Sequence, residues 1–504
     1  MNGRVYSGEF IAKLAEVQDA DAYTRLGDDL RQWLLEWQSA GLMVVPGVEA
    51  ILRLLTLRQS SLMPEPELLP LLALDEADLA LQAEAERVWQ VLVGTGQGME
   101  AAIGEQAGLL VSQNEGLHWL LMPSAFFEWS SIPELALRRL VERLARVDHS
   151  LLWMPLIESE ILKVVFSEQL ERSSPLARRA SSSFSLSESF VPQGIVNVLA
   201  ALTPVMPNQS VYDPLCGLGQ VFREIVDQIC TEQQPWLPDQ VNWLTQDVRD
   251  DWRSMARLSF LLLRIQPLTW FESSYFSKRW WQESSQQAEK FNWVVSFFSP
   301  HTQIEGESDA DAFLLSHIFS LLEVGGRAVL AMSASVLFRR SAYAARKRLV
   351  EDGAIEQVIY LPEAAFRLGN HNTVPMVVVI LRRCLSLMPG PPKPEDMAYR
   401  LIDARSLPLD AERVFPTQSL FRTVYTEDVL DGRLSFCNVT VEQCRAEDYN
   451  LNPPLYLPTP GRSFELERGL AQFEAAELER SAALREMEGC LSRLGFSSSR
   501  EGSV

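Results

Sequence analysis

The sequence contains few residues of the kinds that bind metals or form disulfides. Its 504 residues include only six cysteines and five histidines. No two cysteines have the CxxC spacing and the histidines are scattered, so the pattern of a zinc site or of a disulfide framework is missing. We therefore expect no bound metal, and we expect reduced thiols in a protein that stays in the cytoplasm.

Long hydrophobic runs are missing too, and so is an excess of basic residues. The longest strongly apolar run, residues 374–381, is far shorter than the about 20 residues that a membrane-spanning helix needs. No charged and then apolar leader begins the chain, so we expect neither membrane insertion nor export. Lysine and arginine number 45 against 66 aspartate and glutamate, a formal net charge of −21. That charge argues against a general nucleic-acid coat protein but leaves local basic clefts open.

What is present is the composition of a folded protein of several domains. Apolar residues make up 47% and charged residues 22% of the chain, as in globular proteins. Helical periodicity dominates the first third, a Ser-rich stretch follows, and a proline cluster marks a later break. We expect an α-helical N-terminal domain over residues 1–170, a Ser-rich linker over 171–189, an α/β domain over 190–385, a C-terminal extension over 386–460 and a C-terminal amphipathic helix over 461–504.

Residues 190–385 show short apolar runs that alternate with amphipathic stretches, which is the pattern of a doubly wound α/β sheet. Gly325 and Gly326 are expected to end one helix, with a strand beginning at Ala328. The run 376–383 is expected to form a strand antiparallel to the strand near Val358.

The most informative pattern lies in Ser210–Val226. A strand is expected to end at Asp213, a Cys-Gly-x-Gly turn follows, and a helix begins after Gln220. Gly217 and Gly219 allow the backbone to approach a ligand closely, and the helix N-terminus presents unpaired N–H groups. A tight turn without a ligand would use the same two glycines, so this loop alone leaves both interpretations open.

An acidic residue after the next expected strand supports the cofactor interpretation. Asp247 lies where a carboxylate accepts hydrogen bonds from a ribose. Phe222 stands where a dinucleotide fingerprint needs its third glycine, which disfavours NAD and FAD.

These residues resemble the modification (M) subunits of type I restriction-modification systems, which are S-adenosylmethionine-dependent adenine-N6 DNA methyltransferases. The resemblance spans about residues 190–496. The family's cofactor loop DPxCGxGG is similar to DPLCGLGQ here, with matches at Asp213, Pro214, Cys216, Gly217 and Gly219 and with Gln220 in place of the last glycine. The resemblance implies a class I methyltransferase fold, a Rossmann-like doubly wound sheet, with S-adenosyl-L-methionine as cofactor.

Further segments resemble the same family in the same order. SFVPQ is similar to its F-x-T-P-x segment, which implies that Phe190 and Pro192 close over the cofactor, while Val191 replaces the threonine. In the segment TQD, Asp247 corresponds to the acid that binds the ribose. Glu272 in WFESS corresponds to the acid that contacts the adenine amine.

The end of the chain resembles the family as well. Residues 447–457, EDYNLNPPLYL, are similar to its YNLNxxxY ending, and the terminal helix is similar to the segment that packs on a specificity subunit. DNA and such a subunit are therefore the implied partners.

The catalytic motif departs from the family pattern. Where the family has NPPF after a strand, this chain reads FNWVVSFFSPH over residues 291–301. Phe297 or Phe298 takes the place of the asparagine, Pro300 keeps one proline, and His301 falls at the aromatic position. The resemblance implies that Phe298, Pro300 and His301 line the pocket of a flipped adenine. Phenylalanine offers no acceptor for the target amine, so methyl transfer is expected to be impaired. Ser296 or Ser299 is the alternative acceptor that this segment offers in part.

Two interpretations follow from the sequence. One is an M-subunit-like adenine-N6 DNA methyltransferase with impaired catalysis. The other is a catalytically inactive protein of the same fold, kept as a binding or structural subunit of a defence or DNA-processing complex. A small-molecule methyltransferase fits the fold but not the flanking segments.

Overall fold

The structure is a computed structural model of the chain. It divides into two compact units, Met1–Tyr456 and Leu457–Val504. The expected linker and the expected C-terminal helix lie outside the described residues. The structure describes residues 28–29, 32–33, 35–37, 44–61, 92, 94, 98–113, 128–146, 191–231, 240–246, 256, 260, 268–270, 290–300, 304, 307–362, 365, 367–368, 372–383, 398–408, 424 and 434–457.

The described part of the N-terminal region is helical, as its periodicity predicts. Three α-helices pack against one another: α3 (Val44–Ser61), α5 (Met99–Gln113) and α6 (Glu134–Leu144). A short 3-10 helix, η2 (Trp129–Ser131), precedes α6. The carboxylate of Glu134 accepts a hydrogen bond from the Met99 N–H at 2.9 Å, so the first residue of α6 caps α5.

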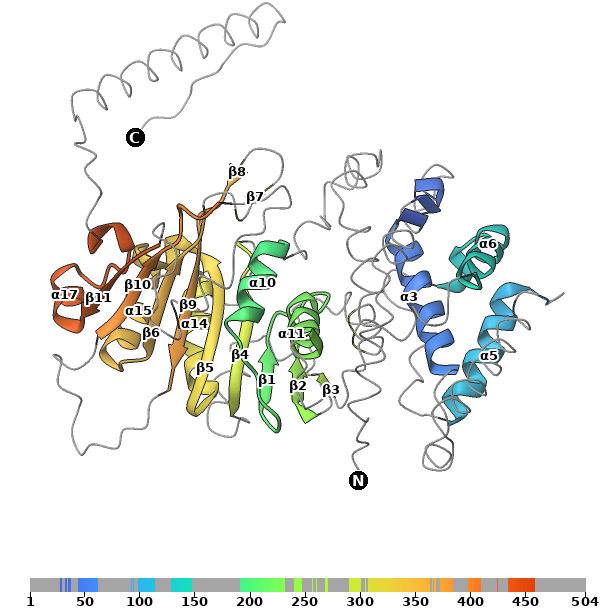
Figure 1. The fold of residues 1–504 in the computed structure, drawn as a ribbon, viewed down its shortest axis with the longest axis horizontal. Helices are drawn as coiled ribbons and strands as arrows, with labels where there is room; N and C mark the ends of the chain where they lie inside the picture. Colours follow the sequence, from blue (N-terminus) through green and yellow to red (C-terminus); the bar gives the residue numbers. More distant parts are fainter. Residues whose placement is uncertain are drawn as a thin grey trace, which may run out of the picture. The chain divides into compact units, whose positions relative to one another are not determined.

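One sheet forms the core of the α/β part (Figure 1), and within the described residues its strand order is β11-β10-β6-β9-β5-β4-β1-β2-β3. The strands are β1 (Ser210–Asp213), β2 (Asn242–Thr245), β3 (Leu268–Trp270), β4 (Phe291–Phe297), β5 (Leu322–Ser333), β6 (Ile355–Tyr360), β9 (Met376–Arg382), β10 (Ala398–Asp403) and β11 (Ser435–Thr440). Strand β9 runs antiparallel to both neighbours and β11 runs antiparallel to β10, whereas the other pairs are parallel. A separate small hairpin pairs β7 (Arg367–Leu368) with β8 (Asn372–Thr373).

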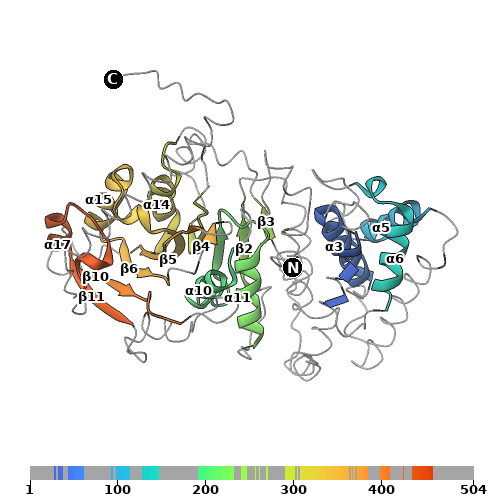
Figure 2. The same cartoon turned by 90° about the horizontal axis from the view of Figure 1, so that it is seen from above.

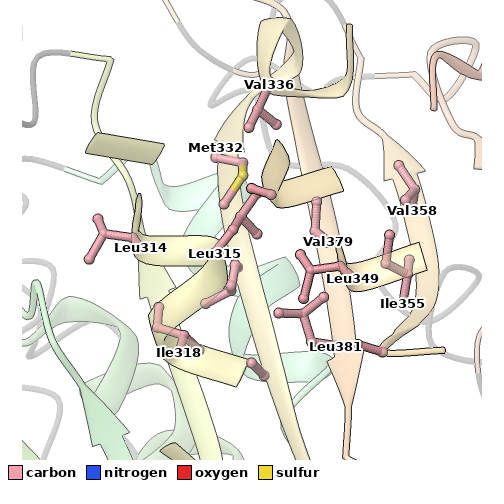
Figure 3. Close-up of a cluster of buried hydrophobic side chains, with 14 of the residues drawn as sticks. Leu314, Leu315, Ile318, Met332, Val336, Leu349, Ile355, Val358, Val379 and Leu381 are labelled. Atoms are coloured by element: carbon pink, nitrogen blue, oxygen red, sulfur yellow. The ribbon is translucent and has the colours of Figure 1, made fainter. Parts of the chain in front are cut away.

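Helices cover both faces of this sheet (Figure 2). One face carries α10 (Gln193–Ala201) and α11 (Gln220–Thr231), and the other carries α14 (Ala310–Leu321) and α15 (Tyr343–Glu351). The second interface is built from aliphatic side chains (Figure 3). It includes Leu314, Leu315 and Ile318 of α14, Leu349 of α15, and Met332, Val358, Val379 and Leu381 of the sheet.

Short elements complete the described part. They are the 3-10 helices η6 (Ala334–Leu337), η7 (Arg340–Ala342) and η10 (Pro453–Leu455), and helix α17 (Val441–Ala446). None of the described helices is both long and apolar enough to cross a membrane.

The expected α/β fold is confirmed, and β9 is antiparallel to β6 as expected. The expected role of Gly325 and Gly326 as a helix stop is wrong. Helix α14 ends earlier, at Leu321, and both glycines lie inside β5, where the register with β4 shifts. Gly325 has a φ of 86°, and a Cβ on Gly326 would lie 2.7 Å from the carbonyl oxygen of Phe291. The glycines therefore permit this irregularity in the strand.

Candidate functional site

The candidate site lies at the carboxyl end of β1. From this central strand the sheet extends through β2 and β3 in one direction and through β4 and β5 in the other. Doubly wound sheets bind ligands at such a switch point, in the crevice beyond the carboxyl ends of the strands. The loop after β1 and the loop after β4 both begin there.

The loop after β1 is shaped by its two glycines. Gly217 and Gly219 have φ values of 53° and 80°, which disfavour residues with a side chain. A Cβ on Gly219 would also lie 2.4 Å from a ring carbon of Phe260. The Cys216 N–H donates to the carbonyl oxygen of Gln246 at 3.0 Å, which ties the loop to the end of β2. This is a cradle of backbone that only glycine permits.

Asp213 joins β1 to β4 at this edge. Its side chain is only 2% exposed. One carboxylate oxygen accepts hydrogen bonds from the Leu215 N–H at 3.0 Å and from the Ser296 Oγ–H at 2.7 Å. Ser296 is the last residue but one of β4. Asp213 therefore fixes the glycine loop after β1 to the strand that precedes the segment resembling the catalytic motif.

Gln220 ties the loop to the segment before α10. Its side-chain oxygen accepts a hydrogen bond from the Val191 N–H at 2.9 Å, and its side-chain nitrogen donates to the Val191 carbonyl oxygen at 3.2 Å. Both residues are buried. The two positions at which this chain departs from the resembled cofactor motifs are therefore bonded to each other.

The end of β2 carries two buried polar side chains. The hydroxyl of Tyr212 donates to the side-chain oxygen of Gln246 at 2.6 Å, and burial, with Asp213 and Cys216 nearby, raises the pKa of Tyr212 well above its usual value. The phenol thus stays a donor at neutral pH. The hydroxyl of Thr245 is buried without a hydrogen-bond partner among the described residues. An unpaired hydroxyl beside the glycine loop is a group that a polar ligand would satisfy.

The two phenylalanines at the end of β4 enter opposite faces of the sheet. Phe297, 6% exposed, packs in the cluster beneath α10 and α11, and Phe298, 0% exposed, packs in the cluster beneath α14. The Phe298 N–H donates to the Ala331 carbonyl oxygen at 2.8 Å, which continues the pairing with β5. The asparagine position of the resembled motif therefore falls on a core side chain in either alignment. Pro300 is half-buried in the turn that follows.

An Asn-Pro-Pro string does occur elsewhere, at residues 452–454. There Asn452 is the N-cap residue of η10, after α17 and not after a strand of the parallel sheet. It therefore lacks the strand-end position that the catalytic motif requires.

The structure brings most described candidates together at this edge. Pro192, Asp213, Pro214, Cys216, Gly217 and Gly219 line or support the loop after β1, while Phe298 and Pro300 follow β4. Phe190, Asp247, Glu272 and His301 lie outside the described residues. Sequence reasoning missed the hydrogen bonds that Ser296 makes to Asp213 and Gln220 makes to Val191, and it missed Arg223, a buried cation on α11. The sequence gives no clear signal for the burial of Arg223, because Gln220 and Asp227, which lie at helical spacing from it, are polar.

Within the described residues no three or more histidine, cysteine, aspartate or glutamate side chains gather as metal ligands. The site instead combines three features at the carboxyl end of β1. They are the loop that contains Gly217 and Gly219, the hydrogen-bonded carboxylate of Asp213, and the Thr245 hydroxyl, which has no partner among the described residues.

This sheet, with one antiparallel strand inserted between β5 and β6 and a glycine loop after β1, has the class I S-adenosylmethionine-dependent methyltransferase fold. Residues 272–463 match the N-6 DNA Methylase family model. The resemblance inferred from the motifs is thereby confirmed at the level of the family.

Solved structures support the fold. The chain is similar to the methyltransferase subunit of a type I restriction-modification system from Streptococcus thermophilus, with a TM-score of 0.58 and 16% identity over 90% of this chain and 100% of that chain. It is similar to a modification subunit of a type I restriction enzyme from Vibrio vulnificus YJ016, with a TM-score of 0.51 and 12% identity over 87% of this chain and 94% of that chain. A chain from a type I R-M system complex gives a TM-score of 0.54 and 16% identity over 93% of this chain and 97% of that chain. No curated protein matches the sequence.

Proposed function

We propose that the chain is a modification-type subunit that binds S-adenosylmethionine and DNA and that transfers methyl groups to adenine N6 poorly or not at all. The observation that carries this proposal is the contrast between the two loops. The loop after β1 keeps the two glycines and the hydrogen-bonded aspartate, whereas Phe297 at the end of β4 and Phe298 after it put their side chains into the core.

The residues after β1 fit the cofactor. The positive φ values of Gly217 and Gly219 give the loop a backbone shape that can approach the amino-acid end of the molecule, and the unpaired Thr245 hydroxyl offers a hydrogen bond. Asp247, two residues past the end of β2 in the sequence, is proposed to bind the ribose, and Glu272 to contact the adenine amine. Bound cofactor supplies an activated methyl group on its sulfonium.

The residues after β4 explain why transfer would be weak. Methyl transfer to an adenine amine needs a hydrogen-bond acceptor that holds the amine in line, and positioning contributes most of the catalysis. Phe297 and Phe298 provide no such acceptor, and the Ser296 side chain, whose hydroxyl donates to Asp213, is fully buried. Losing positioned polar groups costs on the order of 10² to 10⁴ in rate.

Partners follow from the same proposal. Structures similar to this chain are subunits of type I systems. We therefore propose that a specificity-type subunit binds residues 461–504, for which the sequence predicts a helix, and supplies sequence recognition. The complex would act on DNA in the cytoplasm.

Calorimetric titration with S-adenosylmethionine tests cofactor binding first. We expect micromolar binding by the wild-type chain and its loss in Asp213→Ala, with thermal melting to verify that the variant is folded. Tritium transfer to mixed DNA then tests catalysis, with and without candidate partner subunits. Absence of binding would contradict the cofactor site, whereas efficient labelling would contradict the impairment. Binding without transfer even in the presence of partners would favour a catalytically inactive binding subunit.

A further inference from the structure

Arg223 is a buried cation with unused hydrogen-bond donors. It lies in the first turn of α11 and is 2% exposed. One guanidinium nitrogen, Nη2, donates to the side-chain oxygen of Gln193 at 3.3 Å. The Nε and Nη1 groups have no hydrogen-bond partner among the described residues. Burying a charged group with unmade hydrogen bonds is costly, so its presence calls for an anion that completes them.

Two helix N-termini converge on this arginine. Helix α10 begins at Gln193 and α11 begins at Gln220, and the two helices pack against each other. The paired hydrogen bonds between Gln220 and Val191 hold the two starts together at the carboxyl end of β1. Helix N-termini present free N–H groups and a partial positive charge, so both favour a negatively charged ligand.

The other described polar side chains near Arg223 do not use its free donors. Glu224 is the acidic side chain that reaches this cluster within the described part, and its Oε2 accepts a hydrogen bond from the Gln193 side-chain nitrogen at 3.2 Å. That nitrogen also donates to the Asn197 side-chain oxygen at 2.6 Å. Glu224 and Asn197 therefore both accept hydrogen bonds from the Gln193 side-chain nitrogen. Neither accepts one from the Nε or Nη1 group of Arg223.

We propose that Arg223 and the N-terminus of α10 form a buried carboxylate-binding site, occupied by the amino-acid end of the cofactor that the Gly217–Gly219 loop binds. The inference rests on the proposed function, because it extends the same site by one cationic residue. An arginine donates charge-assisted hydrogen bonds to a carboxylate, and the low local dielectric strengthens them. Cofactor binding would thus depend on a charge contact as well as on the glycine cradle.

Two ligands that differ at one end test the site. S-adenosylhomocysteine carries the amino-acid end, whereas 5′-methylthioadenosine keeps the nucleoside and the thioether and lacks the carboxylate. We expect the wild-type chain to bind the first at least about tenfold more tightly in calorimetric titration, and Arg223→Met to lose most of that preference. Arg348→Met, at an arginine whose side chain is 61% exposed on α15, provides a matched control that keeps the preference.

Melting without ligand separates binding from structure. Because Arg223→Met removes a buried and incompletely bonded charge, its melting temperature should equal or exceed that of the wild type. A lower melting temperature of Arg223→Met would mean that Arg223 stabilises the fold, and it would overturn the proposal. In that case Arg223→Gln, which keeps a donor to Gln193 but loses the charge, would also melt at a lower temperature than the wild type.

The outcomes distinguish this inference from the proposed function. If the wild type binds neither ligand, cofactor binding itself is wrong, and the carboxylate site is overturned with it. If the wild type binds both ligands equally, cofactor binding stands and the carboxylate site is wrong. If Arg223→Met keeps the wild-type preference, another group binds the carboxylate and Arg223 does not.

Discussion

The side chain of Gln220 pairs with both backbone groups of Val191, through hydrogen bonds of 2.9 and 3.2 Å. The resembled motifs have glycine at the position of Gln220 and threonine at the position of Val191. The two residues that differ from those motifs are therefore in contact with each other. Together they connect the loop after β1 to the start of α10. The side chain of Gln220 thus holds together the two segments that resemble the family's cofactor motifs.

Removing the Gln220 side chain should weaken this joint. In Gln220→Ala the buried N–H and carbonyl groups of Val191 both lose their partner, so the free energy of unfolding should fall by about 1–3 kcal/mol. Urea denaturation measures the change. Gln228→Ala, on the same helix, should alter stability by less than about 0.5 kcal/mol. Equal effects of the two substitutions would contradict a specific role of the pair.

Ser296 and Asp213 should behave as one unit. The Ser296 hydroxyl donates to the buried Asp213 carboxylate at 2.7 Å, and hydrogen bonds to charged groups contribute about 1.5–3 kcal/mol. We expect a double-mutant cycle of Ser296→Ala and Asp213→Asn to give a coupling energy of at least about 1 kcal/mol in denaturation. Additive effects would show that the bond contributes nothing. Affinity for S-adenosylmethionine should fall in both single variants.

Restoring an asparagine at the end of β4 should not restore methyl transfer. Phe297 is 6% exposed and packs in the core, so Phe297→Asn buries a carboxamide, loses apolar contacts and should lower stability by about 3 kcal/mol. Phe338→Asn, at a ring that is 48% exposed, is the matched control and should have little effect. A gain of DNA methylation in Phe297→Asn would show instead that this side chain can turn toward a substrate.

A carboxylate on α15 should make stability depend on pH. Glu351 accepts hydrogen bonds from Arg445 at 2.8 Å and from the Tyr449 hydroxyl at 2.5 Å, which lower its pKa from 4.5 to about 2. Because the pKa is depressed in the folded state, the stabilisation is complete above about pH 4.5 and is lost as the pH falls toward 2. The melting-temperature difference between wild type and Glu351→Gln should therefore shrink from pH 6 to pH 3. A difference that stays constant over this range would refute the assignment.

The sequence predicted those parts of the fold that local pattern determines. Strand β1 has a buried apolar run and helix α11 a strong periodicity. Asp213 could be located because it ends the strand, and the two loop glycines because they lie between the strand and the helix. Strands β10 and β11 come from the expected C-terminal extension. They are harder to detect, because β11 lies at the sheet edge with most of its side chains exposed or half-exposed.

Contacts between distant segments could not be predicted in this way. Ser296 is 83 residues from Asp213, and Val191 is 29 residues from Gln220. No local propensity encodes such pairs, since they exist only once the sheet order and the helix packing are set. The expected helix stop at Gly325 failed for the same reason, because the irregular pairing of β4 with β5 depends on both strands.

The order of strands also constrains how the protein is made. Strand β9 fills the place between β5 and β6, yet it follows both in the chain. While the ribosome has not yet released residues 376–382, β5 and β6 each keep an open edge of backbone N–H and carbonyl groups. Open edges recruit strands from other chains. Translation products that end before β9 would therefore tend to aggregate, because the edges of β5 and β6 that β9 covers stay unpaired.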